Sequence, residues 1–191
     1  SNNTTMKKLF IICALTLISM LNAYAAGQGK FIHVDNTTSK NIKPQLAFYQ
    51  ERVNGEDITT LLVWTTNVNT YYEFTNASRI LIRFSDGTMT RLSLDTNKEI
   101  KKEKFTKKNA NATITYYKPL TSYATTPELI EKLQNDIAIV KVRVVFKEND
   151  AKDYDIAEGY QTKMASDLKQ SYLDASQRNR QTTGDLSDED F

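Results

Sequence analysis

The amino-acid sequence predicts an α+β fold that is rich in β-structure: an antiparallel sheet or open sandwich, with one short inserted helix and a C-terminal helix packed on it. Two observations favour this class. Residues 30–123 are rich in β-branched and aromatic side chains and are interrupted at short intervals by turn residues. Downstream, apolar residues recur with helical spacing over 126–134 and over 160–177.

Turn chemistry places the strands of the first half. After a first strand at 31–34, residues 45–52 and 58–65 flank Asn54-Gly55, a dipeptide whose tolerance of positive φ suits a hairpin turn. The next hairpin joins 79–84 to 88–94.

The second hairpin has a three-residue loop, Ser85-Asp86-Gly87, in which Gly87 is expected to be left-handed. This loop sets Ile80 opposite Leu92 and Ile82 opposite Thr90 and so keeps one face apolar, whereas a two-residue loop would mix the faces.

The second half begins after a polar interruption at 95–111. Residues 113–123 are expected to be an extended segment that Pro119 breaks. Thr126-Pro127 then favours the start of a short helix, since proline at the first helical position loses no hydrogen bond. Asn135-Asp136 is expected to end that helix.

The most regular alternation covers residues 137–146, where valines face one side and Lys141 and Arg143 face solvent. A closing helix is predicted over 160–177, with one apolar stripe for the sheet. Residues 26–177 therefore form one domain, and the polar, acidic residues 178–191 are predicted to be a disordered tail.

The first 25 residues have the pattern of a cleaved signal peptide. Met6-Lys7-Lys8 is a basic start, residues 9–21 are apolar, and Ala23-Tyr24-Ala25 is the small-x-small cleavage pattern. The apolar run is shorter than the roughly 20 residues that span a bilayer, so no transmembrane anchor is expected after cleavage. Residues 1–5 are interpreted as an expression remnant or a mis-assigned start. The localisation that this predicts is periplasmic or secreted.

Cleavage near Ala25 also changes the charge. The chain has 25 Lys and Arg against 23 Asp and Glu, and losing Lys7 and Lys8 leaves 23 of each sign. A domain without net charge has no overall positive potential to attract the phosphates of nucleic acid, so no nucleic-acid partner is expected. Cys13 leaves with the signal, and one histidine, His33, remains. No cofactor, metal site or cysteine–histidine catalytic pair is therefore predicted.

Carboxylates are the remaining candidates for catalysis, because a pair of them can hydrolyse a glycosidic bond. Glu56-Asp57 and Asp153-Asp155 lie in turn-like stretches, where charged side chains ordinarily face water. No catalytic residue is assigned.

Two groups of residues are candidates for binding. Residues 98–108 hold six lysines and two glutamates, and Lys101, Lys102, Lys107 and Lys108 could hold a polyanion, although a solvated flexible loop is the favoured interpretation. The second group is aromatic. In a strand, the rings of Tyr71-Tyr72 and of Tyr116-Tyr117 would point to opposite faces, which makes Tyr72 and Tyr117 candidates for exposed binding rings.

Three segments carry a resemblance: residues 79–87 with their Asp-Gly turn, residues 122–133 with the short helix, and residues 139–144 with the Lys-x-Arg strand. In these the chain resembles small exported proteins of unknown function of the Bacteroidales type. The resemblance covers roughly residues 58–172 and implies a periplasmic or secreted domain, with no active site to carry over.

The sequence therefore predicts an exported, non-enzymatic interaction or structural module of the bacterial envelope, whose partner is another envelope protein or a glycan. The alternative is a glycan or small-ligand binding protein that uses exposed aromatic rings. A hydrolase with a carboxylate site is the third hypothesis. The oligomeric state stays open.

Overall fold

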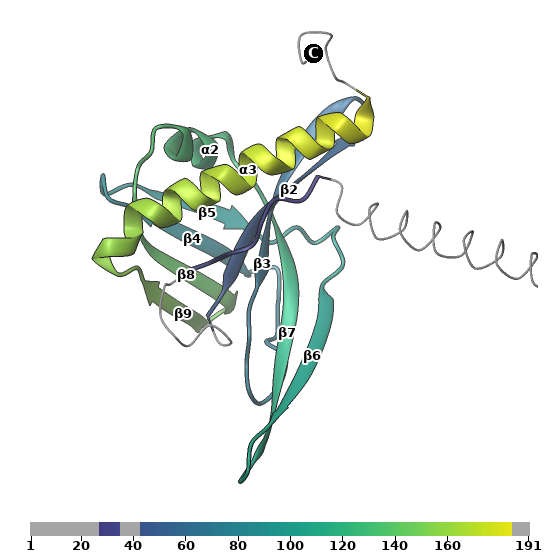
Figure 1. The fold of residues 1–191 in the computed structure, drawn as a ribbon, viewed down its shortest axis with the longest axis vertical. Helices are drawn as coiled ribbons and strands as arrows, with labels where there is room; N and C mark the ends of the chain where they lie inside the picture. The colour runs from purple at the N-terminus through teal and green to yellow at the C-terminus, as the bar shows by residue number, and fades with distance from the viewer. Residues whose placement is uncertain (1–26, 35–42, 185–191) are drawn as a thin grey trace, which may run out of the picture.

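The computed structural model describes residues 27–34 and 43–184. Within them the predicted fold class is confirmed, since two antiparallel sheets are joined by a short helix and closed by a long C-terminal helix (Figure 1). The predicted signal peptide and the last part of the predicted tail, residues 185–191, lie outside the described residues. No helix in the described ranges is both long enough and apolar enough to cross a membrane.

The first sheet has five strands in the order β1-β2-β3-β7-β6. The strands are β1 (Ile32–His33), β2 (Gln45–Val53), β3 (Glu56–Trp64), β7 (Thr113–Ala124) and β6 (Lys101–Lys108). Asn54 and Gly55 both have positive φ, at 51° and 81°, so the predicted turn between β2 and β3 is confirmed. Strands β6 and β7 extend beyond the rest of the molecule as a two-stranded arm (Figure 1).

The second sheet has four strands in the order β5-β4-β8-β9. The strands are β5 (Met89–Ser93), β4 (Arg79–Phe84), β8 (Ile139–Lys147) and β9 (Asp150–Asp155). The predicted register is confirmed, with Ile80 opposite Leu92 and Ile82 opposite Thr90. Gly87, with φ of 84°, is the left-handed residue of the loop.

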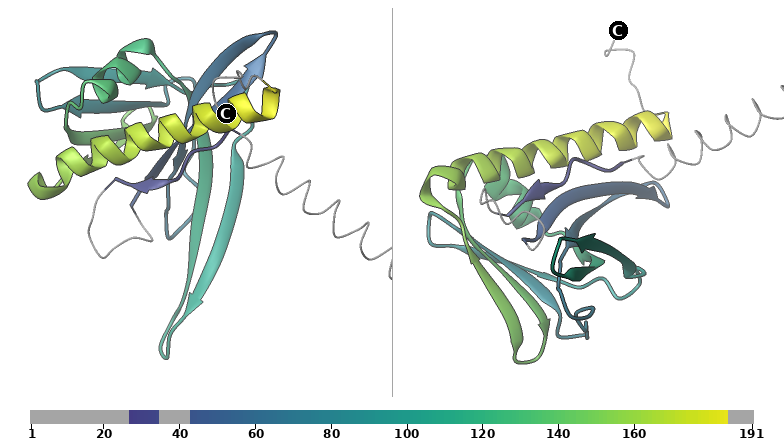
Figure 2. Two further views of the ribbon diagram at one scale, coloured as in Figure 1. Left: turned by 45° about the horizontal axis from the view of Figure 1, so that its top comes forward. Right: turned by 60° about the horizontal axis from the view of Figure 1, so that its bottom comes forward.

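Two helices connect and cover these sheets. Helix α2 (Pro127–Gln134) begins at the predicted Thr126-Pro127, and a short 3-10 helix (Glu158–Tyr160) leads into α3 (Gln161–Thr183). Helix α3 lies along β2 and closes one side of the core (Figure 2).

The predicted boundary between α3 and the tail was wrong, because the helix continues to Thr183 and ends at left-handed Gly184. Asn179 explains the extra length. Its side-chain amide donates to Gln50 Oε1 at 3.2 Å and to Asp57 Oδ1 at 2.9 Å, so a polar residue beyond the apolar stripe is buried against the β2–β3 hairpin.

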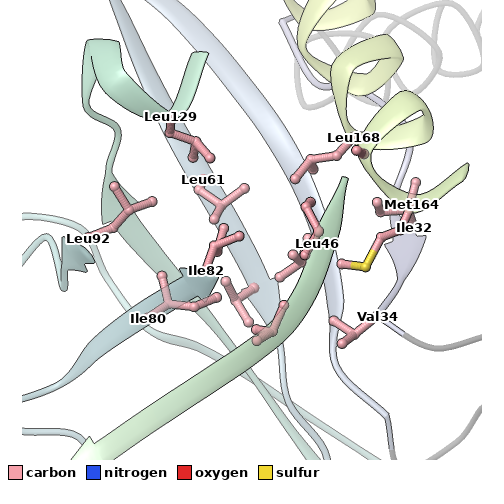
Figure 3. Close-up of a cluster of buried hydrophobic side chains, with 14 of the residues drawn as sticks. Ile32, Val34, Leu46, Leu61, Ile80, Ile82, Leu92, Leu129, Met164 and Leu168 are labelled. Atoms are coloured by element: carbon pink, nitrogen blue, oxygen red, sulfur yellow. The ribbon is translucent and has the colours of Figure 1, made fainter. Parts of the chain in front are cut away.

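One hydrophobic core fills the space between the sheets and the helices (Figure 3). It takes Leu46 and Leu61 from the first sheet, Ile80 and Ile82 from the second, and Leu168 from α3. The alternation predicted for β8 is confirmed from Val142 onward, since Val142, Val144 and Phe146 are fully buried while Arg143 is exposed. It fails at the start of the strand, where Ile139 is buried in place of Val140, because the pairing with β4 shifts register there.

Two expectations about the arm were wrong. The lysine-rich segment is not a flexible loop, because residues 101–108 form β6 and pair with β7 along their whole length. Pro119 does not break β7 either. The Pro119 carbonyl accepts a hydrogen bond from Thr65 N–H, just past the end of β3. In a strand, the N and O atoms of one residue point toward the same neighbouring strand, so the Pro119 nitrogen also faces the β3 side. The missing N–H therefore falls where the β3 ladder has ended.

Candidate functional site

The outer face of the five-stranded sheet carries a continuous set of aromatic and basic side chains. Alternation assigns the face: Thr121 and Tyr123 of β7 are buried in the core, so Tyr116, Lys118 and Leu120 point the other way. Phe105 of β6 lies opposite Tyr116 and therefore shares this face.

Three rings on this face, Trp64, Phe105 and Tyr116, form what we call the ring row. Phe105 and Tyr116 are stacked, with ring centroids 4.8 Å apart and planes at 13°. Lys118 bridges the row, since its ammonium lies 5.0 Å from the Trp64 ring centroid and 6.0 Å from that of Phe105. All three rings are partly exposed. Cation–π and stacking contacts therefore hold the row in one geometry.

The row is extended at both ends. Phe31 lies beside Trp64, with centroids 6.3 Å apart, and Lys107 lies 5.9 Å from the centroids of both Phe105 and Tyr116. Phe31, just before β1, and residues of β3, β6 and β7, distant in the sequence, thus form one surface.

A hollow of about 360 Å³ adjoins the ring row on the same face. Its floor includes Leu62 and Leu120, and polar groups from Tyr49, Thr60 and Ser122 open into it. An apolar floor with a few converging polar groups is typical of a small-ligand site.

The rim of this hollow is fixed by ionic contacts. Lys98 forms an ion pair with Glu51, and the Tyr49 hydroxyl donates to Glu51 Oε2 at 3.4 Å. Burial and the neighbouring Glu51 carboxylate raise the pKa of Tyr49 above its ordinary value, so the phenol keeps its proton at neutral pH and remains a donor.

The four predicted lysines do not form one patch. Lys101 and Lys107 lie on the same face as the ring row, whereas Lys102 and Lys108 alternate to the opposite face. Lys102 lies 5.5 Å from the ring centroid of Tyr71 there. Because β6 is an edge strand, its lysines also oppose pairing with another chain's strand.

The two predicted tyrosines lie away from the ring row. Tyr72 stacks on buried Phe146, with centroids 3.7 Å apart, at the border of the core. Tyr117 packs edge-on against Tyr71 at 5.0 Å, on the face of the arm opposite Tyr116. In the Tyr116-Tyr117 pair, the ring that belongs to the ring row is therefore Tyr116, whereas the sequence analysis named Tyr117 as the candidate.

Two of the candidate carboxylates, Asp57 and Asp153, have basic partners that favour the ionised form. A hydrogen bond from Arg52 lowers the pKa of Asp57, and one from Arg143 lowers the pKa of Asp153. A glycosidase acid needs a raised pKa, so neither carboxylate has the environment for that role. Across residues 27–34 and 43–184, no three Asp, Glu, His or Cys side chains gather in a way that could hold a metal ion.

Sequence reasoning missed Phe105 and Lys118 as site residues and did not connect Trp64 to them. The signal was alternation within 101–108, which puts Phe105 on one face with Lys101 and Lys107. This alternation has meaning only if residues 101–108 form a strand, and their many lysines favoured the prediction of a loop instead.

Comparison of the chain with protein families, with curated proteins and with solved structures finds no match.

Proposed function

We propose that this chain is an exported, non-enzymatic binding module of the bacterial envelope, and that it holds a glycan against the ring row. The observation that carries the proposal is the continuous row of partly exposed rings on one sheet face, beside a hollow with an apolar floor. Aromatic faces stack on the apolar faces of sugar rings, and flanking polar groups take their hydroxyls.

The arrangement favours an extended ligand. Phe31 and Trp64 lie at the end where the sheet joins the body, and Phe105 and Tyr116 lie out on the arm. Ammonium groups at Lys107 and Lys118 alternate with the rings and supply donors along the row. A ligand of several linked units can therefore contact all of these groups at once.

Export is supported by the signal pattern that ends at Ala25. The first described residues are already part of the sheet, since Gln50 N–H donates to the Gly27 carbonyl at 2.8 Å and Gly29 N–H donates to Phe48 O at 2.8 Å. Cleavage after Ala25 would leave these bonds intact. We propose a periplasmic or secreted location on this basis, in keeping with the resemblance to exported proteins of the Bacteroidales type.

Paired variants on the two faces of the arm test the proposal. In Phe105→Ala/Tyr116→Ala the ring row is shortened, whereas Tyr71→Ala/Tyr117→Ala removes the same number of rings from the opposite face. On an array of neutral and envelope glycans, we expect the first variant to lose binding by about 10-fold or more and the second to bind like the parent protein.

Two results would count against the proposal. If no glycan binds the parent protein while it captures an envelope protein whose binding needs the ring row, the module recognises a protein partner. If both paired variants bind a glycan as the parent does, the ligand lies elsewhere.

A further inference from the structure

The outer face of the four-stranded sheet carries a second basic surface, far from the ring row. Arg79, Leu81 and Arg83 alternate onto this face from β4. Arg91 of β5 lies directly opposite Leu81, on the side away from β8. Arg79, Arg83 and Arg91, which we call the arginine triad, therefore surround Leu81.

The triad is not neutralised by the protein's own carboxylates. On the same face, Asp153 binds Arg143 through two hydrogen bonds, and Asp155 pairs with Lys141 at 3.0 Å. Among the described residues, no acid pairs with any member of the triad. The acids gather at β9, so the β4–β5 half of the face carries unbalanced positive charge.

Arg79 is the half-buried member of the triad, whereas Arg83 and Arg91 are exposed. Arg79 Nη1 donates only a long bond, 3.4 Å, to the Ala77 carbonyl, and its Nε is buried without an acceptor in the described structure. The partly exposed remainder of this guanidinium is therefore the part that an anionic ligand would contact.

The surface above the triad is recessed. Two adjoining hollows of about 570 Å³ and about 200 Å³ share Leu81, Arg83, Met89 and Arg143 in their lining. Leu81 and Val145 form a buried apolar floor, and Met89 is 42 % exposed at the edge. The recess thus combines an apolar floor with the guanidinium groups of the arginine triad.

We propose that this face is a second binding site, and that its ligand is an acidic glycan whose carboxylate or sulfate groups are held by the arginine triad. Guanidinium groups match the planar oxygens of such groups with paired hydrogen bonds.

A glycan suits this site better than other polyanions. The strand backbones are already paired within the sheet, so a peptide lying on the face would find no backbone partners for its own N–H and C=O groups. Sugar hydroxyls need only side-chain partners, and Asn149 and Asp150 provide them at one end of the recess. A bilayer surface is also a poor ligand for this site, because a flat surface would not reach the recessed floor formed by Leu81 and Val145.

Binding of size-defined acidic oligosaccharides, polygalacturonate for carboxylate and heparin fragments for sulfate, tests the proposal in the mature chain. Arg79→Gln/Arg83→Gln/Arg91→Gln should weaken binding by about 10-fold or more, with the parent's affinity falling as salt rises. The matched control, Lys102→Gln/Lys104→Gln/Lys108→Gln, removes the same charge from the face of β6 opposite the ring row and should change binding by less than about 3-fold.

A further variant distinguishes recognition by guanidinium hydrogen bonds from non-specific attraction between charges. Arg83→Lys/Arg91→Lys keeps the charge at two exposed positions, and a weaker affinity than the parent's supports recognition by guanidinium geometry. It also serves as the test if the triple variant fails to fold. Equal losses in the triad and lysine variants would overturn the proposal.

The choice of ligand is tested separately. Polyglutamate or anionic vesicles that bind through the triad while the oligosaccharides do not would overturn the assignment of a glycan. Binding of neutral glycans to the ring row should be the same in the triad variant, so this proposal and the proposed function can fail independently.

Discussion

At the scale of single residues, Gly29 is one of two glycines, with Gly27, at which an added Cβ would lie 2.0 Å from a backbone oxygen. A Cβ at Gly29 would lie 2.0 Å from the Ser171 carbonyl oxygen of α3, and 2.5 Å from the Ser171 hydroxyl oxygen. That hydroxyl accepts a buried hydrogen bond from Phe48 N–H at 3.1 Å. Helix α3 thus supplies the acceptor for Phe48 N–H, while the Phe48 carbonyl accepts from Gly29 N–H, and this close approach of the helix needs glycine.

We predict that Gly29→Ala destabilises the protein by about 2 kcal/mol or more, because the helix must move away from the sheet. Gly159→Ala is the matched control, since a Cβ there has nothing within 4 Å, and it should change stability by less than about 0.5 kcal/mol. Urea midpoints at equal slope give both values. Equal effects of the two substitutions would show that α3 does not pack on Gly29.

At the scale of elements, Asp86 joins the β4–β5 loop to helix α2. A hydrogen bond from Lys132, at 2.8 Å, is the largest cause of a pKa lowered from 3.8 to about 2, and hydrogen bonds from the Thr88 hydroxyl and backbone N–H add to it. A carboxylate with a lowered folded-state pKa stabilises the fold above its unfolded-state pKa, and this contribution is lost as pH falls through the folded-state value.

We therefore predict that the parent protein is more stable than Asp86→Asn at pH 6, and that this difference shrinks between about pH 4 and pH 2. Urea unfolding at a series of pH values measures the two curves. Asp174→Asn, which removes a carboxylate that accepts from Gln170 of the same helix, is the control and should run parallel to the parent. A gap for Asp86→Asn that stays constant down to pH 2 would rule out the lowered pKa.

Local signals identified most of the elements. The Asn54-Gly55 and Ser85-Asp86-Gly87 turns and the Thr126-Pro127 helix start each depend on a few adjacent residues, and the structure confirms all three. The alternation in 137–146 is confirmed from Val142 onward. Strand β6 was missed because its eight residues include five lysines, which oppose strand formation locally. Its pairing with β7, stabilised by the Phe105–Tyr116 stack, overrides that tendency.

At the scale of the whole molecule, both candidate sites depend on pairings between distant segments. Trp64 joins Lys118 only because β3 pairs with β7, and the triad has its neutralised neighbour Arg143 only because β4 pairs with β8. Composition could not reveal either surface, since the whole chain has nearly equal numbers of basic and acidic residues, 25 Lys and Arg against 23 Asp and Glu. The charges are separated in space, with carboxylates at β9 and unpaired arginines at β4 and β5.

Trp64 allows the central claim, that the ring row binds a glycan, to be measured directly. It is the one tryptophan of the chain, so its fluorescence reports on the ring row alone. Titrating the mature protein with a glycan selected on the array should shift the emission of Trp64 and protect it from acrylamide. The same concentration dependence should appear in calorimetry. Glycan binding in calorimetry with no change in Trp64 emission or quenching would contradict the claim.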